Sequence, residues 1–163
     1  MIFTAEEWAQ VHAQAEAEYP AECCGVLLTR AEGPATRVLF PCRNAQDEMH
    51  AADPERYPRR ARTAYFIAPK DLQAIGAREA QGYRIAVIYH SHIDAGAYFS
   101  ATDRQNALIG EEPAYAETVY VVLSVVEGRV VDAGAFTWRP DQRDFVAVAF
   151  TPPPVPGAVP RGG

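Results

Sequence analysis

The chain has 163 residues, about the length of one domain, and 48% of them are hydrophobic, which is enough to form a buried core. The formal net charge is −6, and the one cluster of arginines stands among acidic residues: Arg56, Arg59, Arg60 and Arg62. Because affinity for nucleic acid depends on neutralising phosphates, this charge balance argues against a nucleic-acid partner.

The first forty residues predict a helix followed by two strands. Thr4-Ala5-Glu6-Glu7 has the form of a capping box, and the helix that it opens is expected to reach about Tyr19, where Pro20 ends it. Short apolar segments then predict strands at 24–29 and 36–40. The turn between them is expected at Glu32-Gly33-Pro34.

The middle of the chain predicts a long loop and then regular structure. Residues 41–62 are polar and contain three prolines, which is typical of a loop. The elements expected after it are a strand at 63–68, a helix from Pro69 to about Gln81, an apolar central strand at 84–89, a loop at 90–99 and a helix from Ser100 to about Gly110.

The last third predicts strands at 118–126, 130–138 and 143–150, the first two joined by a Glu127-Gly128 turn. Together the elements indicate an α/β protein with a single-domain mixed β-sheet flanked by helices over residues 1–150. Residues 151–163 form a proline-rich C-terminal tail that is expected to be extended.

The N-terminus and the cysteines predict a cytoplasmic protein. No signal peptide is visible, and no apolar run is long enough to span a membrane. Cys23, Cys24 and Cys42 are odd in number and form no Cys-x-x-Cys pair, which fits a reducing compartment better than a disulfide framework. They are expected to be buried small apolar side chains.

The most informative motif places two imidazoles, a hydroxyl and a carboxylate within fourteen positions, as His90-Ser91-His92 followed by Ser100 and Asp103. His90 and His92 follow an apolar strand and are two residues apart, so their side chains can point to the same side. Asp103, in the first turn of the next helix, can complete a His₂Asp set for Zn²⁺ with a fourth position for water. Glu22, just before a buried strand, is a candidate general base whose pKa burial would raise.

Each residue of this set also has a simpler interpretation. Ser-x-x-Asp is a common start of a helix, in which Ser100 is the N-cap and Asp103 favours the helix dipole. A His-x-His pair is ordinary on a surface, and Glu22 alone would be a solvated charge. The joint occurrence on a strand–loop–helix unit is what favours the metal site.

With these residues the chain resembles the JAMM/MPN+ (JAB-type) metallopeptidases, whose signature is an upstream Glu and then H-[ST]-H-x7-S-x2-D. Pro20-Ala21-Glu22-Cys23-Cys24-Gly25 is similar to the family's upstream segment P-x-E-x-C-G. The order of helices and strands agrees with the family over about residues 2–150. The chain departs from many members at Ile93, where they have proline. The resemblance implies the cytidine-deaminase-like/MPN architecture.

The resemblance also implies a role for each matching residue. His90, His92 and Asp103 match the zinc ligands, and Glu22 matches the residue that moves a proton from the metal-bound water to the leaving amine. Ser100 matches the residue that helps to hold the oxyanion. Ser91 matches a position that supports the loop.

For the substrate, the short prokaryotic members imply hydrolysis of a peptide or isopeptide bond after the C-terminal Gly-Gly of a ubiquitin-like or sulfur-carrier protein. The leaving group would be a cysteine, a lysine or a short extension. The alternative is a non-catalytic MPN-type scaffold, against which the complete set of five residues argues. A barrel amidohydrolase would need a longer chain, and a zinc deaminase would need motifs that are absent here.

Three further features carry weaker expectations. His50 is expected to be an exposed residue rather than a further ligand, and Asp94 to be solvated rather than a partner of a ligand. The terminal Arg161-Gly162-Gly163 is similar to the ends of ubiquitin-like proteins, so the tail could enter the protein's own groove as a product mimic. The sequence does not indicate the oligomeric state.

Overall fold

The computed structural model describes residues 1–32 and 36–157. Gly33-Pro34 of the expected turn and the terminal Arg161-Gly162-Gly163 lie outside the described residues. The helices are α1 (Ala5–Glu18), α2 (Gln46–Ala52), α3 (Pro69–Glu79) and α4 (Ala101–Asn106). The strands are β1 (Cys24–Arg30), β2 (Thr36–Cys42), β3 (Arg84–Ile93), β4 (Leu108–Ile109), β5 (Glu112–Pro113), β6 (Val119–Val126), β7 (Arg129–Arg139) and β8 (Asp144–Val148).

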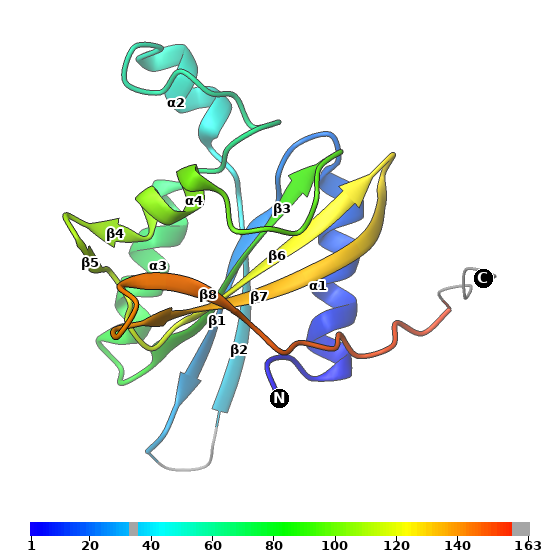
Figure 1. Cartoon of the computed structure of the whole chain (residues 1–163), viewed down its shortest axis with the longest axis vertical. Coiled ribbons are helices and arrows are strands. Elements are labelled where there is room, and N and C mark those ends of the chain that lie inside the picture. The colour runs from blue at the N-terminus through cyan, green and yellow to red at the C-terminus, as the bar shows by residue number, and fades with distance from the viewer. Residues whose placement is uncertain (33–35, 158–163) are drawn as a thin grey trace.

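The main sheet has six strands in the order β2-β1-β3-β6-β7-β8 (Figure 1). Only β3 and β6 are parallel neighbours in it, and the other pairs are antiparallel, so the sheet is mixed, as predicted. The apolar β3 lies in the interior of the sheet, also as predicted. The Glu127-Gly128 turn joins β6 to β7 with positive φ at both residues, the conformation that a two-residue hairpin turn requires.

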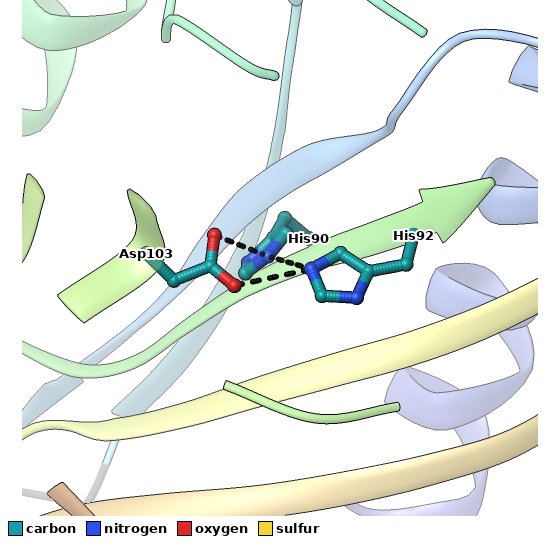
Figure 2. Close-up of side chains that lie close together, drawn as sticks. All are labelled: His90, His92 and Asp103. Atoms are coloured by element: carbon teal, nitrogen blue, oxygen red, sulfur yellow. Dashed lines mark hydrogen bonds and ion pairs between the residues drawn. The ribbon is translucent and has the colours of Figure 1, made fainter. Parts of the chain in front are cut away.

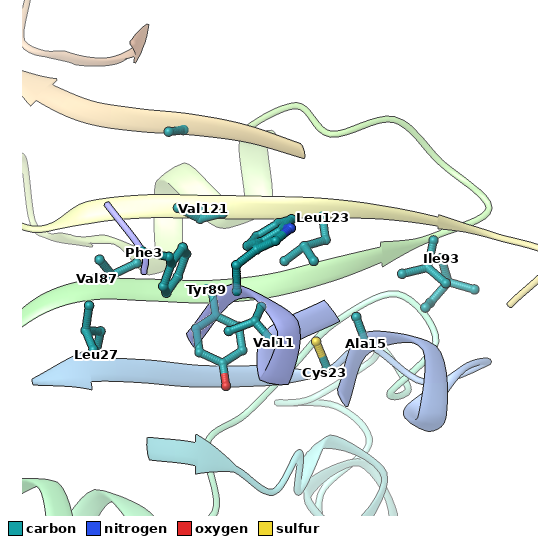
Figure 3. Close-up of a cluster of buried hydrophobic side chains, with 13 residues drawn as sticks. Phe3, Val11, Ala15, Cys23, Leu27, Val87, Tyr89, Ile93, Val121 and Leu123 are labelled. Carbon is teal, nitrogen blue, oxygen red and sulfur yellow. The ribbon is translucent and has the colours of Figure 1, made fainter. Parts of the chain in front are cut away.

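Helix α1 covers one face of the sheet (Figure 3). Its N-cap Thr4 accepts a hydrogen bond from the Glu7 N–H at 3.1 Å and donates its own N–H to the Glu7 carboxylate at 2.8 Å, which is the predicted capping box. The buried residues of the helix pack with alternate residues of the strands, among them Trp8, Val11, Ala15, Leu27, Val87, Tyr89, Val121 and Leu123.

The opposite face carries α3 and the second apolar cluster. Ile75 of α3 packs there with residues that include Val26 of β1, Ile88 of β3 and Trp138 of β7. Because successive residues of a strand point to opposite faces, Tyr89 and Ser91 share the α1 face, whereas Ile88, His90 and His92 share the α3 face. The motif histidines therefore belong to the side of the sheet that α1 leaves uncovered.

Besides the boundary between β3 and the loop predicted at 90–99, three predicted elements were wrong in type or extent. Residues 41–62 contain the helix α2, because Gln46–Ala52 are good helix formers free of proline, and the Asn44 side chain accepts the Gln46 N–H at 2.9 Å. Residues 63–68 form no strand but a single bridge to Asn44, since their backbone bonds to residues 43–45 instead of the sheet. Helix α4 ends early, because Gly110 makes a turn that pairs β4 with β5.

Two other features bear on the organisation of the chain. Residues 151–157 contain no helix or strand, and Val155 packs against the α1-side cluster. The division into a domain at 1–150 and a tail at 151–163 stays a prediction. Among the described helices, none has the length and apolar character that crossing a membrane would require.

A core substitution tests this packing. Leu123 of β6 is 0% exposed, so Leu123→Ala is expected to lower the free energy of unfolding by about 2–5 kcal/mol in urea titrations. The matched control is Leu72→Ala, because Leu72 on α3 is 48% exposed and should change the free energy of unfolding by less than about 1 kcal/mol. Equal effects of the two substitutions would contradict the assignment of Leu123 to the core.

Candidate metal centre

The two motif histidines lie within β3. The sequence analysis placed them in a loop after this strand, and that prediction was wrong. Parallel pairing with β6 continues to the end of β3, with His90 opposite Val122 and His92 opposite Ser124. The strand is longer than its apolar segment because β6 satisfies the backbone of the last residues of β3. The expectation that both imidazoles point to the same side holds, and Figure 2 shows them together with Asp103.

Asp103 reaches the histidines from the first turn of α4. Its backbone N–H donates to Ser100 Oγ at 3.0 Å, and its carboxylate accepts the Ser100 N–H at 2.9 Å, so the two residues form a capping box. The same carboxylate lies 3.1 Å from the Nε2 atoms of both His90 and His92. The helix-cap interpretation and the metal-site interpretation of Ser-x-x-Asp are therefore compatible, because one side chain serves both arrangements.

The spacing of these atoms fits a small metal ion. The ligand atoms of His90, His92 and Asp103 all lie within 4.8 Å of one another, and the two Nε2 atoms are 3.2 Å apart. Two ligands about 2.0–2.1 Å from a tetrahedral zinc ion would be separated by about 3.3 Å. The three side chains thus have the chemistry and the separations of an open His₂Asp zinc site.

The hydrogen bonding of His92 supports the same conclusion. Its Nδ1 lies 2.9 Å from the carbonyl oxygen of Gly96, which can only accept, so Nδ1 carries a proton. In the neutral ring, Nε2 then carries the lone pair, which is the form in which a histidine binds a metal. A backbone carbonyl that orients the ring in this way is usual for a histidine that binds a metal.

The charges of the site are strongly coupled. Burial would raise the pKa of Asp103, but its hydrogen bonds with His90 and His92 outweigh burial and hold the pKa well below its usual range. Burial would lower the pKa of His92, but the hydrogen bond with Asp103 and the Gly96 carbonyl raises it. Within the described residues, the buried Nδ1 of His90 has no hydrogen-bond partner. The site therefore keeps a carboxylate ionised next to two imidazoles.

Glu22 lies beside this cluster. Cys24 pairs with His90 at the end of the antiparallel β1–β3 ladder, and Glu22, two residues before Cys24, is close enough to His92 and Asp103 for their charges to act on its pKa. The link between the strands continues at Cys23, whose N–H donates to Ser91 Oγ at 2.7 Å. Glu22 is 4% exposed, and burial raises its pKa to about 8 against the opposing effect of the His92 and Arg59 charges.

Two aromatic residues that the sequence analysis missed complete the walls of the site. Tyr65 stacks on the His90 ring with centroids 4.6 Å apart, and Tyr98 meets the His92 ring edge-on at 5.0 Å. Tyr98 stands between the ligands in the sequence, which was a usable signal. Tyr65 stands outside the motif, in a segment that the sequence analysis interpreted as a strand, so no sequence signal linked it to the site.

Two of the weaker expectations can be compared with the structure. His50 is not among the ligand residues, and its Nδ1 contacts the Tyr57 carbonyl oxygen at 2.8 Å. Among the described residues Asp94 is exposed and has no hydrogen bond with His90, His92 or Asp103, so the expectation that it is not a partner of a ligand agrees with the structure, but Asp94 is more than a solvated charge. Its carboxylate accepts hydrogen bonds from the Tyr19 hydroxyl, the Arg62 guanidinium and the Glu127 N–H at 2.9 Å each, and so ties three segments to the end of β3.

Comparison with known proteins gives a family match and several relatives. A family model described as prokaryotic homologs of the JAB domain matches residues 4–149. A desampylase of Haloferax volcanii is 32% identical over 131 residues, which cover 80% of this chain and 78% of that protein. The tail tip assembly protein K of Escherichia phage N15 is 34% identical over 94 residues, 58% of this chain, but the match spans only 31% of the phage protein.

Two solved structures are similar over most of the chain. A Salinibacter ruber protein is 27% identical with a TM-score of 0.57, and the match covers 96% of this chain and 93% of that one. A Desulfitobacterium hafniense protein is 20% identical with a TM-score of 0.60, and the match covers 89% of this chain and 87% of that one. Both agree with the α/β fold described above, and the second bears on the fold alone.

Proposed function

Since the chain belongs to the family of prokaryotic homologues of the JAB domain, we propose that it is a zinc-dependent isopeptidase. It would cleave the peptide or isopeptide bond that follows the C-terminal Gly-Gly of a ubiquitin-like or sulfur-carrier protein. The observation that carries the proposal is the convergence of the His90, His92 and Asp103 ligand atoms within 4.8 Å. The desampylase of Haloferax volcanii supports a substrate made by conjugating a ubiquitin-like protein.

His90, His92 and Asp103 would hold the zinc ion. When bound, zinc lowers the pKa of a coordinated water and polarises the carbonyl of the substrate. The protein contributes the orientation of the ligands, because the Gly96 carbonyl fixes the His92 ring and the Ser100 N–H fixes the Asp103 carboxylate.

Glu22 would act as the general base and then as the general acid. Its burial and its raised pKa of about 8 suit a carboxylate that takes up a proton near neutral pH and releases it to the leaving nitrogen. Its electrostatic interaction with His92 and Asp103 supports proton transfer at the same centre.

Ser100 would stabilise the developing negative charge on the carbonyl oxygen of the substrate. Its Oγ already accepts the Asp103 N–H, and this bond fixes the oxygen at the start of α4 while its own proton remains to be donated. A fixed donor of this kind is worth about 10²–10³-fold in rate in other hydrolases.

The proposal is tested by cleavage of defined conjugates. We expect the zinc-loaded protein to release a small ubiquitin-like protein from a lysine side chain at the bond after Gly-Gly, with the products identified by mass spectrometry. A conjugate with Ala-Ala in place of Gly-Gly is the control and should be cleaved at least about tenfold more slowly, because a site that fits an extended glycine tail would discriminate by about 1–3 kcal/mol per added carbon. Tight binding without cleavage would contradict hydrolysis and favour the non-catalytic scaffold.

A further inference from the structure

A cavity of about 720 Å³ adjoins the candidate metal centre. We call it the arginine pocket, because Arg56 and Arg59 contribute to its walls together with Tyr65 and Thr102. Tyr65 is the ring that stacks on His90, and Thr102 directly precedes Asp103. The pocket and the metal centre therefore share the Tyr65 ring. Helices α2, α3 and α4, each of which contributes lining residues, lie on the other side of the sheet from α1 (Figure 1).

The arginine pocket is positively charged, although the chain as a whole has a net charge of −6. No aspartate or glutamate is among its lining residues. Within the described part of the chain, the guanidinium groups of Arg56 and Arg59 form no ion pair with a carboxylate. Glu22, which does not line the pocket, is an acidic residue whose pKa the Arg59 charge lowers. A concave surface lined by two arginines and by no carboxylate attracts an anion, above all a carboxylate that a guanidinium can bind through two hydrogen bonds.

Both arginines are held by their surroundings. The Arg56 guanidinium lies over the Tyr57 ring, 5.4 Å from its centroid, and Arg59 Nη1 donates to the Thr63 carbonyl oxygen at 3.4 Å. Neither contact neutralises the charge. Both side chains are exposed, so their guanidinium groups are accessible to a ligand.

Hydrogen bonds connect the segment that forms the wall of the arginine pocket to the backbone of Glu22. The Glu22 N–H donates to the Ala61 carbonyl oxygen at 2.8 Å, and Asn44 Nδ2 donates to the carbonyl oxygens of Glu22 and Ala64 at 2.9 and 3.1 Å. The segment that carries Arg59 and Tyr65 is thus tied directly to Glu22. Glu22 is the residue assigned to protonate the leaving nitrogen, so this pocket lies on the leaving-group side.

We propose that the arginine pocket binds a carboxylate of the leaving group, a few bonds from the nitrogen that is released. This inference rests on the proposed function, because it takes the leaving-group side from the role of Glu22. The carboxylate comes from one of two sources, either the α-carboxylate of a single C-terminal residue after Gly-Gly or an acidic side chain in a longer polypeptide. In both cases Arg59 selects the leaving group by charge.

Three labelled peptides with a common N-terminal sequence separate these sources. One ends in Gly-Gly-Ala with a free carboxylate, one in Gly-Gly-Ala amide and one in Gly-Gly-Asp amide. Binding is measured by fluorescence anisotropy to the full-length, zinc-loaded Glu22→Gln protein, which does not consume the peptides. We expect the preferred carboxylate peptide to bind about tenfold more tightly than the Ala amide, the effect typical of a charge-assisted hydrogen bond.

The expected difference in affinity should disappear in Arg59→Gln and remain in Arg60→Gln. The second substitution removes the same charge from the next residue, whose side chain does not line the pocket. The difference should also shrink as salt screens the interaction. Tighter binding of the Gly-Gly-Ala carboxylate identifies the α-carboxylate as the source, and tighter binding of the Asp amide identifies a side chain. Equal affinities for all three peptides, or an unchanged preference in Arg59→Gln, would overturn the inference.

Hydrolysis of the same peptides by the wild-type protein is recorded separately. Failure to cleave any of them, or the Gly-Gly conjugates, would count against the proposed function, whereas the binding comparison still decides whether the pocket recognises a carboxylate. The two failures are therefore distinguishable.

Discussion

The substitution Glu22→Gln is expected to lower kcat/KM for a Gly-Gly conjugate by about 10²–10⁴-fold, the range typical of a general acid–base group, while leaving zinc binding intact. The amide has the same shape as the carboxylate but cannot take up and release the proton. Because Glu22 is not one of the three residues with ligand atoms in the cluster, the metal content should stay at about one zinc per chain. Steady-state kinetics and metal analysis of the same preparation check both expectations.

The control for this substitution is Glu111→Gln. The Glu111 side chain is 93% exposed, so the change removes the same charge from the surface of the protein. Its kcat/KM should equal that of the wild type. A Glu22→Gln variant that keeps more than about a tenth of wild-type activity would contradict the assignment of Glu22 as the general base.

Glu22→Gln also has a consequence for stability in the zinc-free protein. Burial raises the pKa of Glu22 from 4.5 to about 8, so between these values the folded state keeps a proton that the unfolded state has lost. The stability contributed by this proton is complete below pH 4.5 and is lost as the pH rises toward 8, by up to about 1.4 kcal/mol per pH unit. Denaturant titrations across this window should show a shallower pH dependence for Glu22→Gln than for the wild type.

The second large effect is expected from loss of a metal ligand. His92→Ala removes one of the three ligand atoms and should lower the zinc content from about one per chain to near zero at micromolar zinc, with hydrolysis falling to background. The wild-type Tm should rise when zinc is added, because binding at a thousandfold excess over Kd stabilises the folded state by about 4 kcal/mol. The Tm of His92→Ala should not respond.

His50→Ala is the matched control, since His50 lies outside the ligand cluster and its Nδ1 contacts the Tyr57 carbonyl oxygen. It should bind zinc and hydrolyse the substrate as the wild type does. If His92→Ala retained stoichiometric zinc and normal activity, the metal centre would lie elsewhere.

Local patterns predicted most of the regular structure. The capping box at Thr4 fixes the start of α1 within one residue, and alternating or continuous apolar segments predict the six strands of the main sheet to within a few residues. The parallel register of β3 and β6 was not accessible from such patterns. It extends β3 through His92, because the backbone of a strand is satisfied by a neighbour that is distant in the sequence.

The chain between residues 41 and 68 shows where sequence reasoning failed. Its helix α2 is short and preceded by a buried Ala45 without a side-chain cap, so it gave no start signal. The extended segment that carries Tyr65 pairs with residues 43–45 through Asn44 rather than with the sheet. The arginine pocket forms where one loop folds over another, and no local sequence pattern predicts it.

The candidate site was predicted more completely than its surroundings. The spacing of His90, His92, Ser100 and Asp103 is short, and a strand followed by a helix start is enough to bring those side chains together. Glu22 is about seventy residues away in the sequence, and the family resemblance rather than spacing assigned its role. Its place near His92 and Asp103 is consistent with its position just before β1, which pairs with β3 at Cys24 and His90.

The central claim is that the protein hydrolyses a bond after Gly-Gly with Glu22 moving the proton. Its most direct test is cleavage of a Gly-Gly conjugate in water enriched in heavy oxygen, with the released ubiquitin-like protein weighed intact. Hydrolysis predicts one heavy oxygen atom in the new glycine carboxylate with the zinc-loaded wild type and no product above background with Glu22→Gln. An uncleaved conjugate with the zinc-loaded wild type, or equal labelled product from both proteins, would contradict the claim.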